Sequence, residues 1–278
     1  MKDVANGWEK TPSVRISLLG YNEVSSSELI PSFHSCKLTT PQPTLVNHVF
    51  ENYPIPQTQH LTLYLNEGKR LQLEAPRTNG VQSYLSDIIP QQDDNDREEL
   101  MFKYTFDKRS YLVGNSKAIV YISCPDSDDM DVFVQLRKVD KAGKILKHLN
   151  IPLGDLGMTE EQVPNLNPFK YTGPTGILRA SHRALDDKLS KPHWPVHHHQ
   201  KEEKIVPGTI VKLEIGLWAA GMIFSDGESI VLKISGHWMT LPEFPALRGK
   251  MVAQNNGRHY VHYGAGTPSH VILPLVEL

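Results

Sequence analysis

Short runs in which apolar and polar residues alternate recur along this chain, with the period of two that is typical of β-strands. The clearest run lies at residues 60–74. There Leu61, Leu63 and Leu65 alternate with polar neighbours, and Leu71 and Leu73 repeat the pattern after a polar turn at residues 66–69. This arrangement predicts a β-hairpin.

Similar patterns predict most of the other elements. Residues 130–139 form a strand in which Val132, Val134 and Leu136 alternate with Phe133, Gln135 and Arg137. The one predicted helical turn falls within residues 154–167, because residues 159–162 follow the logic of a helix N-cap. Further strands are predicted at residues 14–19, 100–106, 118–124, 176–184, 210–217, 229–234 and 259–263.

Many short strands bounded by Pro and Gly turns, with almost no helix, favour an all-β fold, a jelly-roll-like β-sandwich. We find neither an internal repeat nor a sharp linker, so we expect residues 1–278 to form a single β-sandwich domain. Residues 22–59 are predicted to hold a loop-rich insertion, because residues 22–43 are rich in Ser, Pro and Thr.

Composition narrows the class of protein. Hydrophobic residues make up 39% of the 278 positions and charged residues 22%, as in soluble globular proteins. The net charge of −2 predicts no nucleic-acid partner. No stretch approaches the length needed to span a bilayer, and the first ten residues lack the apolar core of a signal peptide, so we expect a cytoplasmic protein without a membrane partner. The sequence leaves a homodimer open.

The sequence contains no convincing candidate for a catalytic nucleophile. A serine hydrolase needs its nucleophile on a strand-to-helix elbow. The nearest candidate is Ser116, but a strand-like run follows it, so we expect no serine-hydrolase activity. Of the two cysteines, Cys36 sits in a Ser/Thr/Pro-rich loop and Cys124 ends a predicted core strand, where a buried, inert thiol is the usual outcome.

Two segments could in principle bind a cation. His197 and His199 would point to one face of an extended segment, and His193 could join them, but no acidic or thiol ligand is spaced with them in a known zinc pattern. Residues 91–99 form an acidic run that we interpret as a solvated loop in preference to a cation site. We therefore predict no metal site and no cofactor.

The remaining candidates for a site are mostly aromatic. Trp218 and Trp238 each follow a predicted strand, and in the strand at 259–263 Tyr260 and His262 share one face while His259, Val261 and Tyr263 share the other. Core packing or ordinary exposure explains such residues too. Amphipathic rings at strand ends are nevertheless what a small-molecule pocket in a β-sandwich is made from.

One long stretch, residues 173–227, carries a resemblance. It contains Gly-Ile-Leu-Arg-Ala-Ser-His-Arg at 176–183, Trp-Pro at 194–195, several histidines, Pro-Gly at 207–208 and an apolar strand that ends at Trp218. In this order it resembles the C-terminal β-domain of the X-Pro dipeptidyl-peptidase and cocaine-esterase family of serine hydrolases. Residues 8–20, 106–109, 118–123, 128–134 and 268–274 extend the likeness, with breaks around 30–50 and 238–258.

The resemblance implies a jelly-roll, galactose-binding-like fold that lacks the catalytic residues. In the family an α/β-hydrolase domain comes first, and this chain begins where that domain would end. The resemblance also implies a structural role for the strand that carries Arg179 and Arg183, and we expect either arginine to pair with Asp186, Asp187, Glu202 or Glu203.

We considered four functions: an interaction module without chemistry, a carbohydrate-binding module, an intact hydrolase, and a binding pocket that catalyses by shape alone. We favour the last. On this hypothesis the chain binds a hydrophobic, oxygenated small molecule and steers its cyclisation, a pericyclic Diels-Alder-type reaction, by orientation and hydrogen bonding. The precedent for such catalysis is an analogy at the level of the fold. The predicted substrate-binding residues are Trp218, Trp238, Tyr260, His262, Arg179 and His182.

Overall fold

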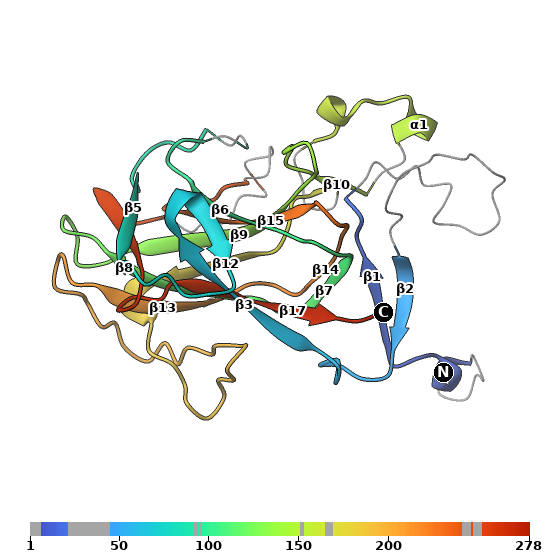
Figure 1. Cartoon of the computed structure of the whole chain (residues 1–278), viewed down its shortest axis with the longest axis horizontal. Coiled ribbons are helices and arrows are strands. Elements are labelled where there is room, and N and C mark those ends of the chain that lie inside the picture. The colour runs from blue at the N-terminus through green and yellow to red at the C-terminus, as the bar shows by residue number, and fades with distance from the viewer. Residues whose placement is uncertain are drawn as a thin grey trace.

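A computed structural model describes residues 7–21, 45–91, 94, 96–150, 153–164, 169–240, 246 and 252–278 of the chain. Strands dominate these residues (Figure 1). The strands are β1 (Val14–Leu18), β2 (Leu45–Phe50), β3 (Gln59–Asn66), β4 (Arg70–Gln72), β5 (Gly80–Leu85), β6 (Leu100–Thr105), β7 (Ser110–Gly114), β8 (Lys117–Ser123), β9 (Asp131–Val139), β10 (His148–Leu149), β11 (Lys170–Tyr171), β12 (Thr175–Arg179), β13 (Val211–Gly216), β14 (Ala220–Phe224), β15 (Ser229–Ser235), β16 (Arg258–Tyr263) and β17 (His270–Val276).

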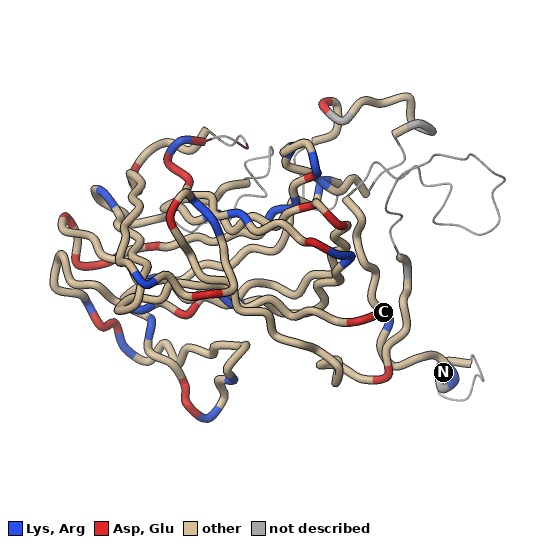
Figure 2. Tube along the Cα trace, viewed as in Figure 1, with Lys and Arg blue, Asp and Glu red and all other residues tan. Residues whose placement is uncertain are grey.

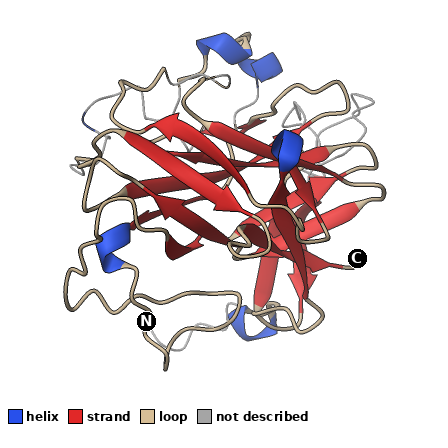
Figure 3. Ribbon diagram, turned by 60° about the vertical axis from the view of Figure 1, so that its left-hand side comes forward, coloured by secondary structure: helices blue, strands red, loops and turns tan. Residues whose placement is uncertain are grey.

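The helical segments among the described residues are a few residues long, as Figure 3 shows. They are η1 (Trp8–Lys10), η3 (Glu67–Lys69), α1 (Leu153–Leu156), η4 (Glu160–Gln162) and η5 (Ala180–His182). The helical turn predicted within 154–167 is confirmed by α1 and η4. At η4 the Gln162 side chain accepts a hydrogen bond of 2.8 Å from the Thr159 backbone N–H, which is half of a capping box.

Most strands belong to one largely antiparallel sheet that is folded into two layers (Figures 1 and 3). One layer has the order β12-β9-β15-β6, and the other is built around β3, β17, β8 and β16. Short β4 joins them, because it pairs with β3 in the predicted hairpin and with β6 in parallel. The core lies between the layers and includes Phe102, Leu136 and Leu232 from one side and Val120 and Leu273 from the other. The predicted all-β sandwich is confirmed.

Several strands differ from the prediction. β5, β7 and β14 were not expected, and β2 lies inside the segment predicted to be a loop-rich insertion. Residues 22–44 of that segment lie outside the described residues. These strands are short and contain Gly or polar residues, so their patterns are weak. Pairing with a neighbour defines them: β14 pairs with β7 along its whole length, and β2 pairs with β1.

β9 departs from simple alternation. All nine of its residues are buried, including Gln135, Arg137 and Lys138. β9 lies between β12 and β15 in the sheet, and the burial of consecutive residues shows that both of its faces are covered. Its charged groups therefore need partners. Arg137 donates to Asp94 at 2.7 Å, and the Lys138 ammonium contacts Glu228 at 2.8 Å and the Gly20 carbonyl at 2.7 Å.

The strand predicted at 176–184 is shorter than expected. β12 ends at Arg179, and the turn η5 follows because two groups of the neighbouring segment hold it. The Ala180 N–H donates to the Met130 carbonyl at 2.8 Å, and the Ser181 N–H donates to the Asp129 carboxylate at 2.9 Å. His182 therefore lies on a turn and not on a strand.

Candidate functional site

A cleft of about 430 Å³ opens beside β9 and β12. Its floor is shaped by Thr172, Gly173 and Pro174, which pass over the backbone of β9. The Leu136 N–H donates to the Pro174 carbonyl at 3.0 Å. Gly173 has φ +132°, and a Cβ there would lie 1.9 Å from the Leu136 carbonyl oxygen, so this close approach requires glycine.

Aromatic rings from separate elements meet at this cleft. Trp218 follows β13, and Trp238 follows β15. Trp218 is 76% exposed, while its backbone N–H donates to the Thr175 carbonyl at 3.1 Å. Trp238 packs edge-on against Phe133, with 5.0 Å between ring centroids. Tyr171 adds a fourth ring, and burial raises the pKa of its phenol to about 12, so the hydroxyl keeps its proton at neutral pH.

One polar residue of a central strand, Gln135, is among the residues that line the cleft. Gln135 of β9 is fully buried, and its Nε2 donates to Thr172 Oγ1 at 2.9 Å. Its Oε1 is buried and has no hydrogen-bond partner among the described residues. Such an acceptor is costly unless a donor reaches it. Gln135 is not among the predicted site residues, although a polar residue within an apolar strand is a usable signal.

The structure separates the six predicted substrate-binding residues. Trp218 and Trp238 lie together at the cleft, as their shared position after strands suggested. Arg179 and His182 belong to the opposite end of β12 and the turn after it. Tyr260 and His262 lie half-buried on one face of β16, and His259, Val261 and Tyr263 are buried on the other, as alternation predicted.

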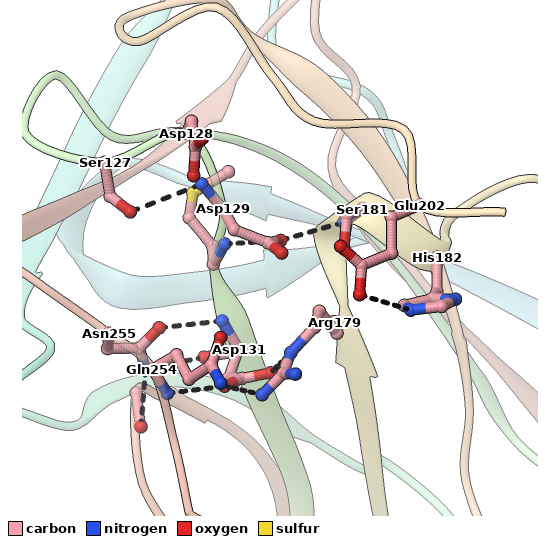
Figure 4. Close-up of polar contacts among 12 residues, drawn as sticks. Ser127, Asp128, Asp129, Asp131, Arg179, Ser181, His182, Glu202, Gln254 and Asn255 are labelled. Carbon is pink, nitrogen blue, oxygen red and sulfur yellow. Dashed lines mark hydrogen bonds and ion pairs between the residues drawn. The ribbon is translucent and has the colours of Figure 1, made fainter.

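Arg179 is part of a structural polar cluster (Figure 4). It donates two hydrogen bonds, at 2.8 and 2.9 Å, to the buried carboxylate of Asp131, which also accepts the Gln254 N–H at 2.9 Å. Asn255 exchanges hydrogen bonds with the Asp131 backbone. The prediction that Arg179 or Arg183 pairs with an acidic residue of the following loop is met by Arg183, and Arg179 pairs with Asp131 instead. Arg183 does contact a predicted partner, Glu203, at 3.7 Å.

Ser116 and Cys124, which were rejected above as catalytic nucleophiles, are both buried in the protein. Ser116 is fully buried between β7 and β8, and the strand β8 follows it directly, as predicted. Cys124 is buried, also as predicted, and burial raises the pKa of its thiol. Cys36 lies outside the described residues.

The loop at residues 190–200, called the histidine loop below, brings two of its three candidate rings close together, and the third lies elsewhere. The rings of His197 and His199 are 5.8 Å apart, and His199 is 5.3 Å from His182, which lies 3.8 Å from Glu202. His193 instead stacks on His60. Among the described residues, three potential ligands converge elsewhere: the ligand atoms of Asp96, Glu99 and His237 all lie within 4.8 Å of one another.

This last group corrects the interpretation of residues 91–99 as a solvated loop. Asp96 and Glu99 are each only 2% exposed. His237 Nε2 lies 3.3 Å from Glu99 and 3.7 Å from Asp96, and the fully buried ammonium of Lys233 contacts Glu99. The lysine supplies the positive charge that a metal ion would bring. The loop is therefore tied into the protein by buried ion pairs.

Charged residues of both signs are interspersed along the chain (Figure 2). Within the described residues, no helix has the length and apolar character required to cross a membrane.

Fold and cleft together define a β-sandwich domain with an aromatic-lined cleft and a cluster of buried ion pairs. The sequence profile of the X-Pro dipeptidyl-peptidase C-terminal non-catalytic domain matches residues 6–272, so the chain belongs to that family. No curated protein sequence matches the chain.

Solved structures agree with this assignment. A CocE/NonD family hydrolase from Staphylococcus aureus is similar with a TM-score of 0.76 and 28% identity, over 99% of this chain and 43% of that one. An aminopeptidase from a marine sediment Thaumarchaeota archaeon has a TM-score of 0.55 at 14% identity, over 83% of this chain and 39% of its own. An α-amino acid ester hydrolase has a TM-score of 0.51 at 15% identity, over 77% and 36%. The last two likenesses show the fold alone. The chain spans less than half the length of each of these proteins.

Proposed function

We propose that this chain is a ligand-binding β-sandwich module whose cleft binds a flat, hydrophobic, oxygenated small molecule. One observation carries the proposal: Trp218 and Trp238 line one cleft together with Gln135, whose buried Oε1 has no hydrogen-bond partner among the described residues. A volume of about 430 Å³ falls within the range of small-molecule sites.

The chemistry of the cleft defines the ligand class. The indole faces offer stacking surface, so a planar ring suits them. Gln135, Thr172, Thr175 and Thr240 supply the polar groups of the lining, and a small turn of the Gln135 side chain would offer its unpaired Oε1 to a ligand hydroxyl or N–H. A flat ring that carries a hydroxyl group satisfies both conditions.

The proposal has a second part, which is that the cleft steers a cyclisation of the bound molecule. A pericyclic reaction needs neither a nucleophile nor a proton relay, and a cleft can accelerate it by holding diene and dienophile in a near-attack pose. The aromatic walls would orient the diene, and the hydroxyl and amide groups would bond its polar substituents.

A matched pair of probes tests binding. 2-Naphthol has a planar ring and a hydroxyl donor, whereas 2-methoxynaphthalene has no donor. We expect calorimetry to show saturable binding of 2-naphthol. Trp218→Ala and Trp238→Ala should each weaken binding of both probes about tenfold, since a lost stacking ring costs about 1–2 kcal/mol. Gln135→Met should weaken binding of 2-naphthol alone.

Trp8→Ala is the control, because it removes another exposed indole, 70% exposed, that does not line the cleft. Methyl β-D-galactopyranoside tests the carbohydrate-binding alternative. Saturable binding of the sugar that depends on Trp218, without binding of 2-naphthol, would replace the proposal with that alternative. No saturable binding of any of these compounds would overturn it.

The cyclisation needs its own readout. After the thiols are blocked with N-ethylmaleimide and the excess is removed, the protein is incubated with 9-hydroxymethylanthracene and fresh N-ethylmaleimide. We expect an excess of one enantiomer of the adduct, lost in Trp218→Ala. A racemic adduct formed at the background rate would overturn the cyclisation and leave the binding proposal standing.

A second candidate is a non-catalytic module that accompanies a hydrolase domain. The Staphylococcus aureus relative favours it, since this chain corresponds to 43% of that hydrolase. If none of the compounds tested binds to the cleft, the non-catalytic module remains as the function of this chain.

A further inference from the structure

A second cavity, of about 460 Å³, lies apart from the aromatic cleft and shares no lining residue with it. It is enclosed by three segments that are distant in sequence: residues 53–60 before and within β3, the end of β7, and the part of the histidine loop at 191–194. Pro274 of β17 closes one side.

Hydrogen bonds hold these walls in place. The Tyr53 hydroxyl donates to Asn115 Oδ1 at 2.8 Å, and Asn115 Nδ2 donates to the Leu217 carbonyl at 3.3 Å. Across the cavity, Lys191 and Trp194 exchange two backbone hydrogen bonds of 2.8 and 3.0 Å. The cavity is therefore built by the fold and not left by a loose loop.

Its lining combines apolar surface with basic groups. Tyr53, Ile55 and Trp194 supply aromatic and aliphatic walls, together with prolines at 54, 56 and 274. Among the described residues, the ionisable side chains that line it are Tyr53, His60, His193 and Lys191, and none of the lining residues is a carboxylate. The His60 and His193 rings stack with 4.6 Å between centroids and 29° between planes.

The groups around His193 are all potential cations. His60 faces it from β3, Lys191 from the same loop and Lys117 from β8. Of these, Lys117 has a counterion, since it contacts Glu214 at 2.7 Å. Burial lowers the pKa of His193, and the charges of His60, Lys191 and Lys117 lower it further. Groups that can carry positive charge are thus gathered at a cavity that no carboxylate of the described residues lines.

We propose that this cavity binds an aromatic monoanion, a flat ring that carries a carboxylate or sulfonate group. The ring lies against Trp194, Tyr53 and the prolines, and the anionic group lies between the stacked imidazoles and the Lys191 ammonium. An anion beside an imidazole favours its protonated form. Binding therefore takes up protons, and affinity rises as the pH falls from 8 to 6. This inference is independent of the proposed function of the cleft.

A matched pair of probes separates charge from apolar contact. 8-Anilinonaphthalene-1-sulfonate carries the anion, and N-phenyl-1-naphthylamine has the same aromatic skeleton without it. With the folded protein, we expect saturable fluorescence enhancement with the sulfonate, at least tenfold tighter binding than with the neutral amine, and about tenfold tighter binding at pH 6 than at pH 8. The affinity for the neutral amine should not change over this range.

Variants assign the site. His60→Gln and Lys191→Gln should each weaken binding of the sulfonate about five- to tenfold, and His193→Gln should reduce its pH dependence. Lys141→Gln is the matched control, because it removes an exposed lysine from the turn after β9, which does not line the cavity. Trp218→Ala, which alters the cleft, should leave sulfonate binding unchanged.

Equal binding of the two probes, or sulfonate binding that survives both His60→Gln and Lys191→Gln unchanged, would overturn the proposal. Loss of binding in Trp218→Ala alone would place the probe in the cleft and also overturn it. Circular dichroism of each variant ensures that a loss of binding reports the site and not unfolding.

Discussion

At the scale of single residues, this protein is distinguished by charged side chains placed inside an all-β core. Asp131, Lys138, Lys233 and Glu99 are each at most 2% exposed, and each contacts a group of opposite charge. Burying such a group is costly unless it is paired, and breaking one pair leaves the partner charge uncompensated. Stability should therefore depend on these few contacts more than on the surface ion pairs.

The Asp131–Arg179 pair provides the first test. Asp131→Asn keeps the size of the side chain but removes the charge that accepts two hydrogen bonds from Arg179. We expect it to lower the free energy of unfolding by about 3 kcal/mol. The measurement is urea denaturation. Glu203→Gln, which alters the more exposed contact with Arg183, is the control and should change the midpoint little. Equal effects of the two variants would contradict the prediction.

A buried histidine should make stability depend on pH. Burial lowers the pKa of His259 from 6.5 to about 4. In the unfolded chain this imidazole takes up a proton below about pH 6.5, whereas in the folded protein it stays neutral down to about pH 4. The contribution of this group to the free energy of unfolding is therefore fully present above pH 6.5. It is lost as the pH drops from 6.5 to 4, by about 3 kcal/mol.

Urea titrations at several pH values measure this slope. His259→Gln preserves a polar side chain opposite the Tyr84 hydroxyl, which lies 3.0 Å from His259 Nδ1. Between pH 6.5 and 4, the variant should show a smaller slope of the free energy of unfolding against pH, by an amount that corresponds to the uptake of up to one proton on unfolding. His182→Gln, in the turn η5 where the side chain is partly exposed, is the comparison. An unchanged slope in His259→Gln would show that His259 is not the group responsible.

At the scale of elements, the approach of β12 to β13 positions the cleft. Gly176 of β12 lies so close to Gly216 of β13 that a Cβ on Gly176 would be 2.3 Å from the Gly216 carbonyl oxygen. Thr175, one residue earlier, bonds the backbone of Trp218. This contact joins the two layers and brings the indole over the cleft.

Gly176→Ala should separate these strands. We expect a loss of at least about 2 kcal/mol in the free energy of unfolding, as for other overpacked sites, together with weaker binding of 2-naphthol. Gly266→Ala is the control, because a Cβ there meets no atom within 4 Å. A Gly176→Ala variant as stable as the parent would mean that the two strands can move apart at little cost.

At the scale of the whole molecule, the loop at 91–99 and the end of β15 are tied together by Asp96, Glu99, His237 and Lys233. The same residues could hold a metal only if the lysine ammonium moved away. We expect the melting temperature to be the same with and without EDTA, and zinc to produce no increase. A drop of several degrees with EDTA that zinc reverses would establish a structural metal.

Lys233→Met should destabilise the protein in either buffer, because it leaves the Glu99 carboxylate buried without its cation.

The sequence by itself determined the fold class and most of the strands. Alternation with a period of two is a local property, so it identified the β3–β4 hairpin and the two faces of β16 without knowledge of the rest of the chain. Turn chemistry near Thr159 likewise identified η4. The resemblance carried by residues 173–227 led to the correct family.

The tertiary structure alone decided which side chains meet. β9 has both faces covered, so the polar Gln135 and Arg137 became buried, and the acidic run at 91–99 folded inward onto Lys233. The six predicted site residues were selected by type and strand position, but strand order places Trp218 and Trp238 at one cleft and the other four elsewhere. Strand pairing joins residues more than a hundred positions apart, and local patterns carry no information about such partners.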